Sequence, residues 1–190
     1  MKRLVAKISN PKKEIIKLSI PLTMLLTTIH VEASFSKLAK VANMHPETLE
    51  KIVHKLVKIE STTGKYDVKN RTSGAYGRYQ IMPSTAKFYA KKLTIPKNKW
   101  KLPSNQDKIF NAIMKDNILS LKRNGHKVSA FSLYATHQQG AGGFNAIMKN
   151  KALTKRLEKS LRQNLPDKLR KVRKSKLRIT WINYWKRKLS

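Results

Sequence analysis

The residue with the clearest chemical potential is Glu60, an acid on the apolar face of a predicted helix. Counting about 100° per residue from Leu49, the apolar residues fall within about 80° of one direction, and Glu60 falls at about 20°. These apolar residues are Ile52, Val53, Leu56 and Val57. Burial raises the pKa of a carboxyl group, which can then donate a proton near neutral pH. The apolar stripe alone is equally compatible with a second interpretation. In it, Glu60 is an acid at the helix end that turns to solvent or caps a neighbouring helix.

Two glycine-containing segments could complete a site around this acid. The first follows Glu60 directly: Ser61 comes next, residues 73–77 read Ser-Gly-Ala-Tyr-Gly, and residues 79–86 read Tyr-Gln-Ile-Met-Pro-Ser-Thr-Ala. The second, residues 140–143, reads Gly-Ala-Gly-Gly and ends a predicted helix that carries Tyr134, His137 and Gln138. It lacks the Gly-Lys-Ser/Thr sequence that a phosphate-binding loop needs.

The first segment resembles a known signature. Glu60-Ser61, the Ser-Gly-Ala-x-Gly run and Gln-Ile-Met-Pro-x-Thr-Ala together look like lytic transglycosylases of the soluble (SLT) type, relatives of goose-type lysozyme. The resemblance covers about 27 contiguous residues. It implies that Glu60 is the single catalytic acid/base and that the loop lines a sugar cleft. The substrate-binding residues that it implies here are Ser61, Ser73, Gly74, Ala75, Tyr79, Gln80 and Met82.

The second segment departs from the family pattern. The family carries Ala-Tyr-Asn-Ala-Gly here, and its Tyr and Asn contact the catalytic site. The register that fits the glycines places His137 on that Tyr and Gln138 on that Asn. Tyr134, three residues before His137, could share the same helical face. We therefore expect Tyr134, His137 and Gln138 to bind substrate, while the alternative is a flexible helix end with exposed glutamines.

The resemblance implies a peptidoglycan lytic transglycosylase that cleaves the β-1,4 bond between MurNAc and GlcNAc and leaves 1,6-anhydroMurNAc ends. It implies no cofactor and no metal. Asp67 is the only other acid in the signature segment. A goose-type hydrolase that uses Asp67 to hold a water is the first alternative. A non-enzymatic basic protein that binds nucleic acid is the second, but it accounts for the charge alone.

The composition is strongly basic, with 42 Lys and Arg against 10 Asp and Glu and a formal charge of +32. Such a charge attracts polyanions. We expect peptidoglycan glycan strands and an anionic cell-wall polymer as partners, and no specific nucleic acid. Fifteen of the basic residues lie in 151–190. The chain has no Cys and no His-Glu-x-x-His spacing, so neither a thiolate metal site nor a zinc protease is indicated.

The N-terminus is interpreted as an export signal over residues 1–33. Six basic residues precede an apolar core at 18–29, and Val-Glu-Ala at 31–33 offers a cleavage site. Residues 34–190 would then be the exported SLT-type domain, periplasmic or extracellular, with no stable membrane span after cleavage. It could serve wall remodelling, a phage or a secretion system. Retention of the segment as an uncleaved anchor is the competing fate.

The elements that must position these residues are predicted to be helical, in a mainly α, lysozyme-like domain. A helix over 46–60 precedes an irregular or β-like loop to about 82 and a helix from Pro83 to about 93. A capping box, Ser104-x-x-Asp107, starts a helix that Gly125 ends. Further helices are expected over 129–138, 144–150, 154–165 and 166–189. Trp181 and Trp185, four residues apart, should dock the last of these helices on the domain.

Overall fold

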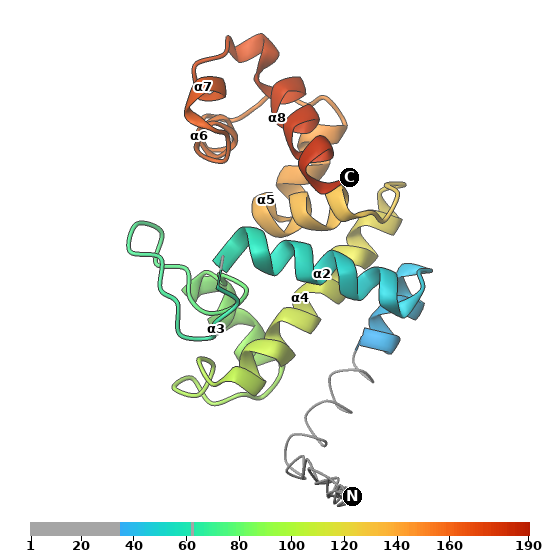
Figure 1. Ribbon diagram of the computed structural model, residues 1–190, viewed down its shortest axis with the longest axis vertical. Coiled ribbons are helices and arrows are strands. Elements are labelled where there is room, and N and C mark those ends of the chain that lie inside the picture. Colours follow the sequence, from blue (N-terminus) through green and yellow to red (C-terminus); the bar gives the residue numbers. More distant parts are fainter. Residues whose placement is uncertain (1–34, 62) are drawn as a thin grey trace, which may run out of the picture.

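The computed structural model describes residues 35–61 and 63–190. The described chain is mainly helical, as predicted, and its only β-structure is a set of isolated bridges after the first long helix. Helical residues 35–42 precede seven named helices (Figure 1). These are α2 (Pro46–Ser61), α3 (Pro83–Lys92), α4 (Pro103–Arg123), α5 (Ala130–Met148), α6 (Lys155–Gln163), α7 (Asp167–Arg170) and α8 (Lys174–Leu189). The export signal predicted over 1–33 lies outside the described residues.

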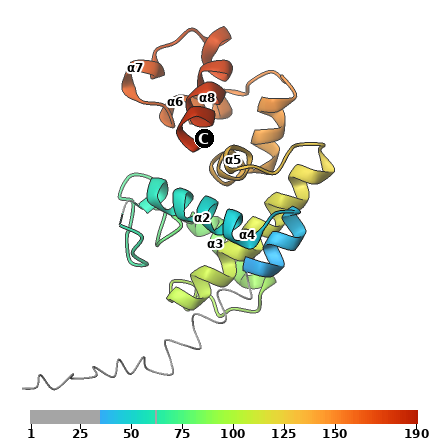
Figure 2. The ribbon, with the colours of Figure 1, turned by 45° about the vertical axis from the view of Figure 1, so that its right-hand side comes forward.

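The helices form two groups with α5 between them. In Figures 1 and 2, α6, α7 and α8 lie at one end, α2, α3 and α4 lie at the other, and α5 runs between them. Helix α5 packs against α4 on one side and against α6 and α8 on the other, so it links the two groups. None of the helices within the described residues has the length and apolarity needed to cross a membrane.

Helix α2 forms where the apolar stripe predicted it. It begins at Pro46, whose fixed φ suits a first helical turn, and it ends at Ser61. The stripe is buried: Leu49 and Leu56 have no exposed surface, and Ile52, Val53 and Val57 are each less than a tenth exposed. This burial fixes the rotation of the helix, so the side chain that continues the stripe at its last turn must face the interior.

The N-cap of α4 lies two residues before the predicted Ser104, and the capping-box prediction is wrong. The N-cap is Leu102, which makes no side-chain cap hydrogen bond, and Pro103 occupies the first turn. The carboxylate of Asp107 instead accepts hydrogen bonds from two tyrosine hydroxyls. A proline at this position already supplies the required φ and removes one unpaired N–H, so the helix can start without the box. The residues predicted to face inward are buried: Phe110, Ile113, Met114, Ile118 and Leu121.

The glycine segment interrupts α5, as predicted, but at one residue only. Gly140 leaves helical geometry, with φ 72° and ψ 158°, and two helical stretches meet there at a kink before the helix continues to Met148. Gly142 and Gly143 are helical. Gly140 tolerates the positive φ that other residues avoid, and this single residue kinks the helix rather than ending it.

The last predicted helix, 166–189, is two helices. Helix α7 ends at Arg170 and α8 begins at Lys174. The guanidinium of Arg162 donates to the carbonyls of Arg170 and Val172, at 2.7 and 2.8 Å, and so holds the intervening turn. The predicted docking by tryptophans is confirmed, because Trp181 and Trp185 are 0% and 5% exposed on the inner face of α8.

Candidate active site

Glu60 lies in the last turn of α2 and is partly buried. Burial raises the pKa of its carboxyl group from 4.5 to about 7. Glu47 and Glu50 on the same helix are exposed, and Glu50 pairs with His54 at 3.7 Å. Glu60 is therefore the acid of α2 that can both give and take a proton near neutral pH.

Helix α5 carries Tyr134, a buried tyrosine that lies within electrostatic range of this carboxyl group. Tyr134 is 2% exposed, and burial together with the negative charge of Glu60 raises the pKa of its hydroxyl. The side-chain amide of Gln138 donates a 2.7 Å hydrogen bond to that hydroxyl. The hydroxyl stays protonated at neutral pH, and its oxygen already accepts from Gln138. Its own proton is thus not used in the hydrogen bond with Gln138.

The loop after α2 folds back on itself through short backbone bridges. Tyr76 pairs with Ile81 through two antiparallel hydrogen bonds of 3.1 and 3.0 Å, and the Gly77 amide donates to the carbonyl of Val68 at 2.8 Å. Gln80 adopts a positive φ of 47°. Its side-chain amide donates to the carbonyls of Val68 and Gly77, at 3.2 and 2.9 Å. Gln80 therefore stabilises the loop from within.

A fully buried glutamine on α4, Gln106, anchors this loop. Its amide nitrogen donates to the carbonyls of Tyr66 and Lys101, at 2.9 and 2.7 Å, and its oxygen accepts from the Arg78 amide at 3.2 Å. Gly77 lies directly on it, with φ +81°, and a Cβ there would stand 1.7 Å from the Gln106 oxygen. Any larger residue at position 77 would therefore collide with the anchor.

Asp107, next to Gln106, provides a second anchor. Its carboxylate accepts hydrogen bonds from the hydroxyls of Tyr66 and Tyr79, at 2.9 and 2.8 Å. Tyr79 is 5% exposed and stacks on Phe110 with ring centroids 3.8 Å apart. The guanidinium of Arg78 lies 5.5 Å from the centre of the Tyr66 ring. This cluster joins the loop to α4. In this position Tyr79 supports the loop, and its ring is not presented to solvent.

His137 on α5 also contacts the loop, at the backbone of Tyr79. Its Nε2 lies 3.1 Å from the carbonyl of Tyr79, and its ring is 5.9 Å from that of Phe110. Burial lowers the pKa of His137, so the ring is neutral at pH 7 and Nε2 must carry the proton that reaches the carbonyl. Tyr134, one turn earlier, is the side chain on which the charge of Glu60 acts.

The remaining predicted residues fall into a buried and an exposed group. Ser61 and Ala75 are each 5% exposed, and the Ser61 hydroxyl donates to the Val57 carbonyl and accepts from the Gly64 amide. Ser61 thereby joins the end of α2 to the loop. The exposed or partly exposed group consists of Ser73, Gly74, Met82 and Asp67. Only this second group presents a side chain or backbone that a large substrate could reach directly.

Sequence reasoning missed Gln106 and Asp107, although one signal was present. Gln106 precedes Ile109, Phe110 and Ile113 at helical spacing, so it lies on the apolar stripe of α4 as Glu60 lies on that of α2. A polar residue in that position needs partners when buried, and here three backbone groups supply them. No local sequence pattern predicts that Tyr66 and Tyr79 hydrogen-bond to Asp107.

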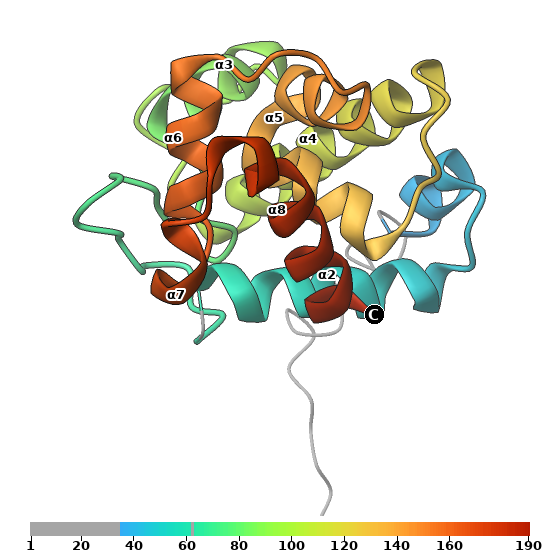
Figure 3. The same cartoon turned by 90° about the horizontal axis from the view of Figure 1, so that it is seen from above.

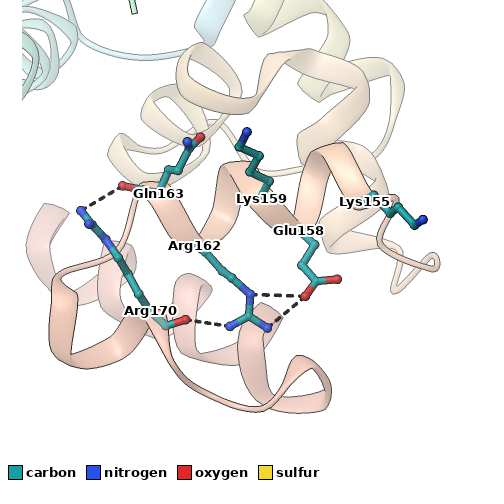
Figure 4. Close-up of a pocket in the computed structure, with 6 residues that line it drawn as sticks. All are labelled: Lys155, Glu158, Lys159, Arg162, Gln163 and Arg170. Carbon is teal, nitrogen blue, oxygen red and sulfur yellow. Dashed lines mark hydrogen bonds and ion pairs between the residues drawn. The ribbon is translucent and has the colours of Figure 1, made fainter. Parts of the chain in front are cut away.

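A separate surface hollow lies on α6 and α7 (Figure 4). It is lined by Lys155, Glu158, Lys159, Arg162, Gln163 and Arg170. Its arginines are engaged within the fold: Arg162 pairs with Glu158 at 3.0 Å, and Arg170 donates to the carbonyl of Leu165 at 2.8 Å and pairs with Asp167. The hollow contains none of the residues around Glu60. No three His, Asp or Glu side chains gather as metal ligands in the part of the chain that the structure describes.

Comparison with known proteins identifies one family. The sequence model described as "Transglycosylase SLT domain" matches residues 10–163. The match includes Glu60, the loop after it and α5, and it ends at the last residue of α6. It begins inside the segment interpreted as an export signal, so the boundary after residue 33 stays a prediction. No curated protein and no solved structure matches the chain.

Proposed function

Because the chain belongs to the transglycosylase SLT domain family, we propose that it is a peptidoglycan lytic transglycosylase with Glu60 as its single acid/base. The bond cleaved is the β-1,4 link between MurNAc and GlcNAc. The observation that carries the proposal is the position of Glu60, which continues the buried face of α2 at its last turn, where burial raises the pKa of the carboxyl group to about 7. A group with this pKa can act first as an acid and then as a base at neutral pH.

In the first step, protonated Glu60 gives its proton to the glycosidic oxygen. The bond between C1 and that oxygen breaks, and the GlcNAc side leaves with a new hydroxyl group. The positive charge that develops at C1 is supported by the N-acetyl oxygen of the substrate itself. The Tyr134 hydroxyl, which Gln138 holds at 2.7 Å and whose pKa the charge of Glu60 raises, keeps its own proton while Glu60 becomes ionised.

In the second step, ionised Glu60 removes the proton from the C6 hydroxyl of the same MurNAc. The C6 oxygen then bonds to C1 and closes a 1,6-anhydro ring. Glu60 is protonated again, and no water is consumed. Both steps use one carboxyl group, so the second carboxylate that most glycosidases require is not needed.

The product decides between this proposal and the goose-type hydrolase. Incubation of the purified protein with peptidoglycan, followed by mass analysis of the released muropeptides, should give anhydro ends. These are lighter than the hydrolytic reducing ends by one water. Reducing ends would assign the hydrolase, and the absence of any released sugar would remove the enzymatic proposal.

Replacement of Asp67 by Asn tests the single-acid mechanism. Asp67 is exposed in the loop after α2. We expect the specific rate of muropeptide release to change by less than about threefold, because a group outside the transition state contributes little to its stabilisation. The rate can be measured by the release of soluble fragments from labelled sacculi. A loss as deep as that caused by removing the acid at position 60 would instead favour a hydrolase with two carboxylates.

We also propose that the basic surface attaches the protein to anionic groups of the wall. Cleavage after residue 33 would remove six basic and two acidic residues and leave a formal charge of +28. The exposed connection between α7 and α8 carries Lys171 and Arg173, which have no ion pair within the described residues. Lys174 pairs with Glu158 at 3.1 Å and is less available. Individual contacts of this kind are weak and are screened beyond about 8 Å at physiological salt.

Binding to isolated sacculi should therefore fall steeply as sodium chloride is raised. Changing Lys171 and Arg173 to Gln should lower the salt concentration at which half the protein is released, with the anhydro product unchanged. The Lys97→Gln and Lys99→Gln pair, on the exposed loop between α3 and α4, removes the same charge elsewhere and is the control. Sedimentation across a salt series measures the effect, and salt-independent binding would place the attachment in the active site instead.

A further inference from the structure

The last helix of the chain lies beyond the family match but inside the core of the fold. The match ends at residue 163, whereas α8 spans Lys174–Leu189. Helix α8 packs against both α5 and α6. Its inner face is buried, and the residues on that face are Leu177, Trp181, Trp185 and Leu189. The C-terminal segment is therefore a structural part of the domain that carries Glu60.

The end of α8 also reaches the helix of the catalytic acid. Seen from above, α8 crosses α2 near the C-terminus (Figure 3). The ammonium of Lys55 on α2 donates a 3.1 Å hydrogen bond to the backbone carbonyl of Ser190. Lys55 precedes Glu60 by five residues, about one and a half helical turns, so the end of α8 contacts the helix of the acid through this exposed side chain.

Trp185 makes the closest aromatic contact with Tyr134. The two ring centroids are 4.5 Å apart with an interplanar angle of 41°. The Trp185 ring is itself held, because its indole N–H donates a 3.1 Å hydrogen bond to the carbonyl of Asn164, and Tyr184 packs edge-on against it at 5.0 Å. Tyr134 is buried, and the direction of its hydroxyl depends on the Trp185 ring against which its own ring packs.

We propose that Trp185 is a positioning residue, which holds the Tyr134 hydroxyl beside Glu60, and that α8 thereby belongs to the active site although it lies outside the family domain. The inference rests on the proposed function. Trp185 acts through the Tyr134 ring, and Gln138 holds the Tyr134 hydroxyl by a 2.7 Å hydrogen bond. A loss of the indole lets the ring tilt and removes the hydroxyl from a defined position, which lowers the turnover rate more than substrate affinity.

Trp181 offers a matched control on the same helix. Trp181 is 0% exposed, and its ring centroid lies 6.1 Å from that of Phe131. No aromatic contact with Tyr134 is present for it among the described residues. Trp181→Leu and Trp185→Leu remove the same group from the same buried face, four residues apart. A purely structural role of α8 predicts that the two changes affect activity alike.

The test measures kcat and KM for muropeptide release by full-length variants, per folded molecule. We expect Trp185→Leu to lower kcat by on the order of tenfold to a hundredfold with little change in KM, the scale known for misplaced catalytic groups. Trp181→Leu should keep kcat within about twofold. Trp185→Phe keeps a ring against Tyr134 and should recover most of kcat. Should Trp185→Leu fail to fold, Trp185→Met, which also lacks a ring, takes its place and is compared with Trp181→Met.

A double-mutant cycle with Tyr134→Phe gives the deciding readout. If Trp185 acts through the Tyr134 hydroxyl, Trp185→Leu should cause little further loss of kcat once that hydroxyl is gone. Losses that multiply, or equal losses in the Trp181 and Trp185 variants, would overturn the inference and leave the proposed function standing. A wild-type protein that releases no muropeptide would overturn both.

Discussion

Replacement of Glu60 by Gln is expected to abolish muropeptide release while the protein remains folded. Gln keeps the shape of the side chain but cannot give or take a proton. General acid–base catalysis contributes roughly a hundredfold to ten-thousandfold in rate. With one residue serving both steps, we expect a loss at the upper end of that range. The rate of soluble fragment release from labelled sacculi measures it.

The pH dependence of the wild-type rate should show the titration of Glu60. Glu60 has a pKa of about 7, and the acid form starts the reaction. The rate should therefore fall as pH rises above about 7, with a slope of one proton. The Glu50→Gln variant, which changes an exposed acid on the same helix, should retain both the rate and the profile. Wild-type turnover by folded Glu60→Gln would end the catalytic assignment.

The same substitution should change how stability depends on pH. The folded state binds the Glu60 proton more tightly than the unfolded state, because burial raises the pKa from 4.5 to about 7. Between these values the folded state holds more protons, so the free energy of unfolding of the wild type decreases as pH rises. The shift corresponds to on the order of 3 kcal/mol at most. Glu60→Gln removes this decrease, and denaturant unfolding at pH 5 and pH 8 would reveal the difference.

Replacement of Gly77 by Ala is expected to have the largest effect on stability. The new Cβ would meet the Gln106 side-chain oxygen at 1.7 Å, and φ is +81°. The Gln106 amide cannot move away freely, because three hydrogen bonds to Tyr66, Arg78 and Lys101 hold it in a fully buried position. Loss of buried hydrogen bonds costs about 1–3 kcal/mol each, and the positive φ adds about 1–2 kcal/mol.

We therefore expect Gly77→Ala to lower the free energy of unfolding by about 3 kcal/mol or more. Muropeptide release should fall with it, because Gln106 anchors the loop that follows the acid. Gly74→Ala is the matched control: its φ is +75°, but no atom lies within 4 Å of the added Cβ. It should cost only the backbone strain, about 1–2 kcal/mol. Equal losses in thermal unfolding of the two variants would show that Gln106 does not lock the loop.

Several features of the site follow from local sequence rules. Glu60 could be found because helical periodicity is a local property, and five apolar residues in 49–57 fix which face of α2 is buried. The starts of α2 and α3 follow from Pro46 and Pro83, and the spacing of Trp181 and Trp185 predicts that both dock on one side of α8. The mainly helical class followed from the same patterns.

Other local rules misled where a tertiary contact competed with them. Asp107 has the spacing of a capping residue, but the hydroxyls of Tyr66 and Tyr79 reach its carboxylate instead. The break before α8 depends on Arg162, which binds carbonyls eight and ten residues away.

The sequence by itself determined that Glu60 continues the buried face of its helix, the order of the helices and the class of fold, because each depends on residues close together in the chain. Only the tertiary structure decided what surrounds the acid. Gln106 meets the loop 28 residues before it at Arg78, and His137 meets Tyr79 across 58 residues. Trp185 lies on Tyr134 because α8 packs across α5. Such contacts have no period in the sequence, since they depend on how whole helices pack and on which buried polar groups then need partners.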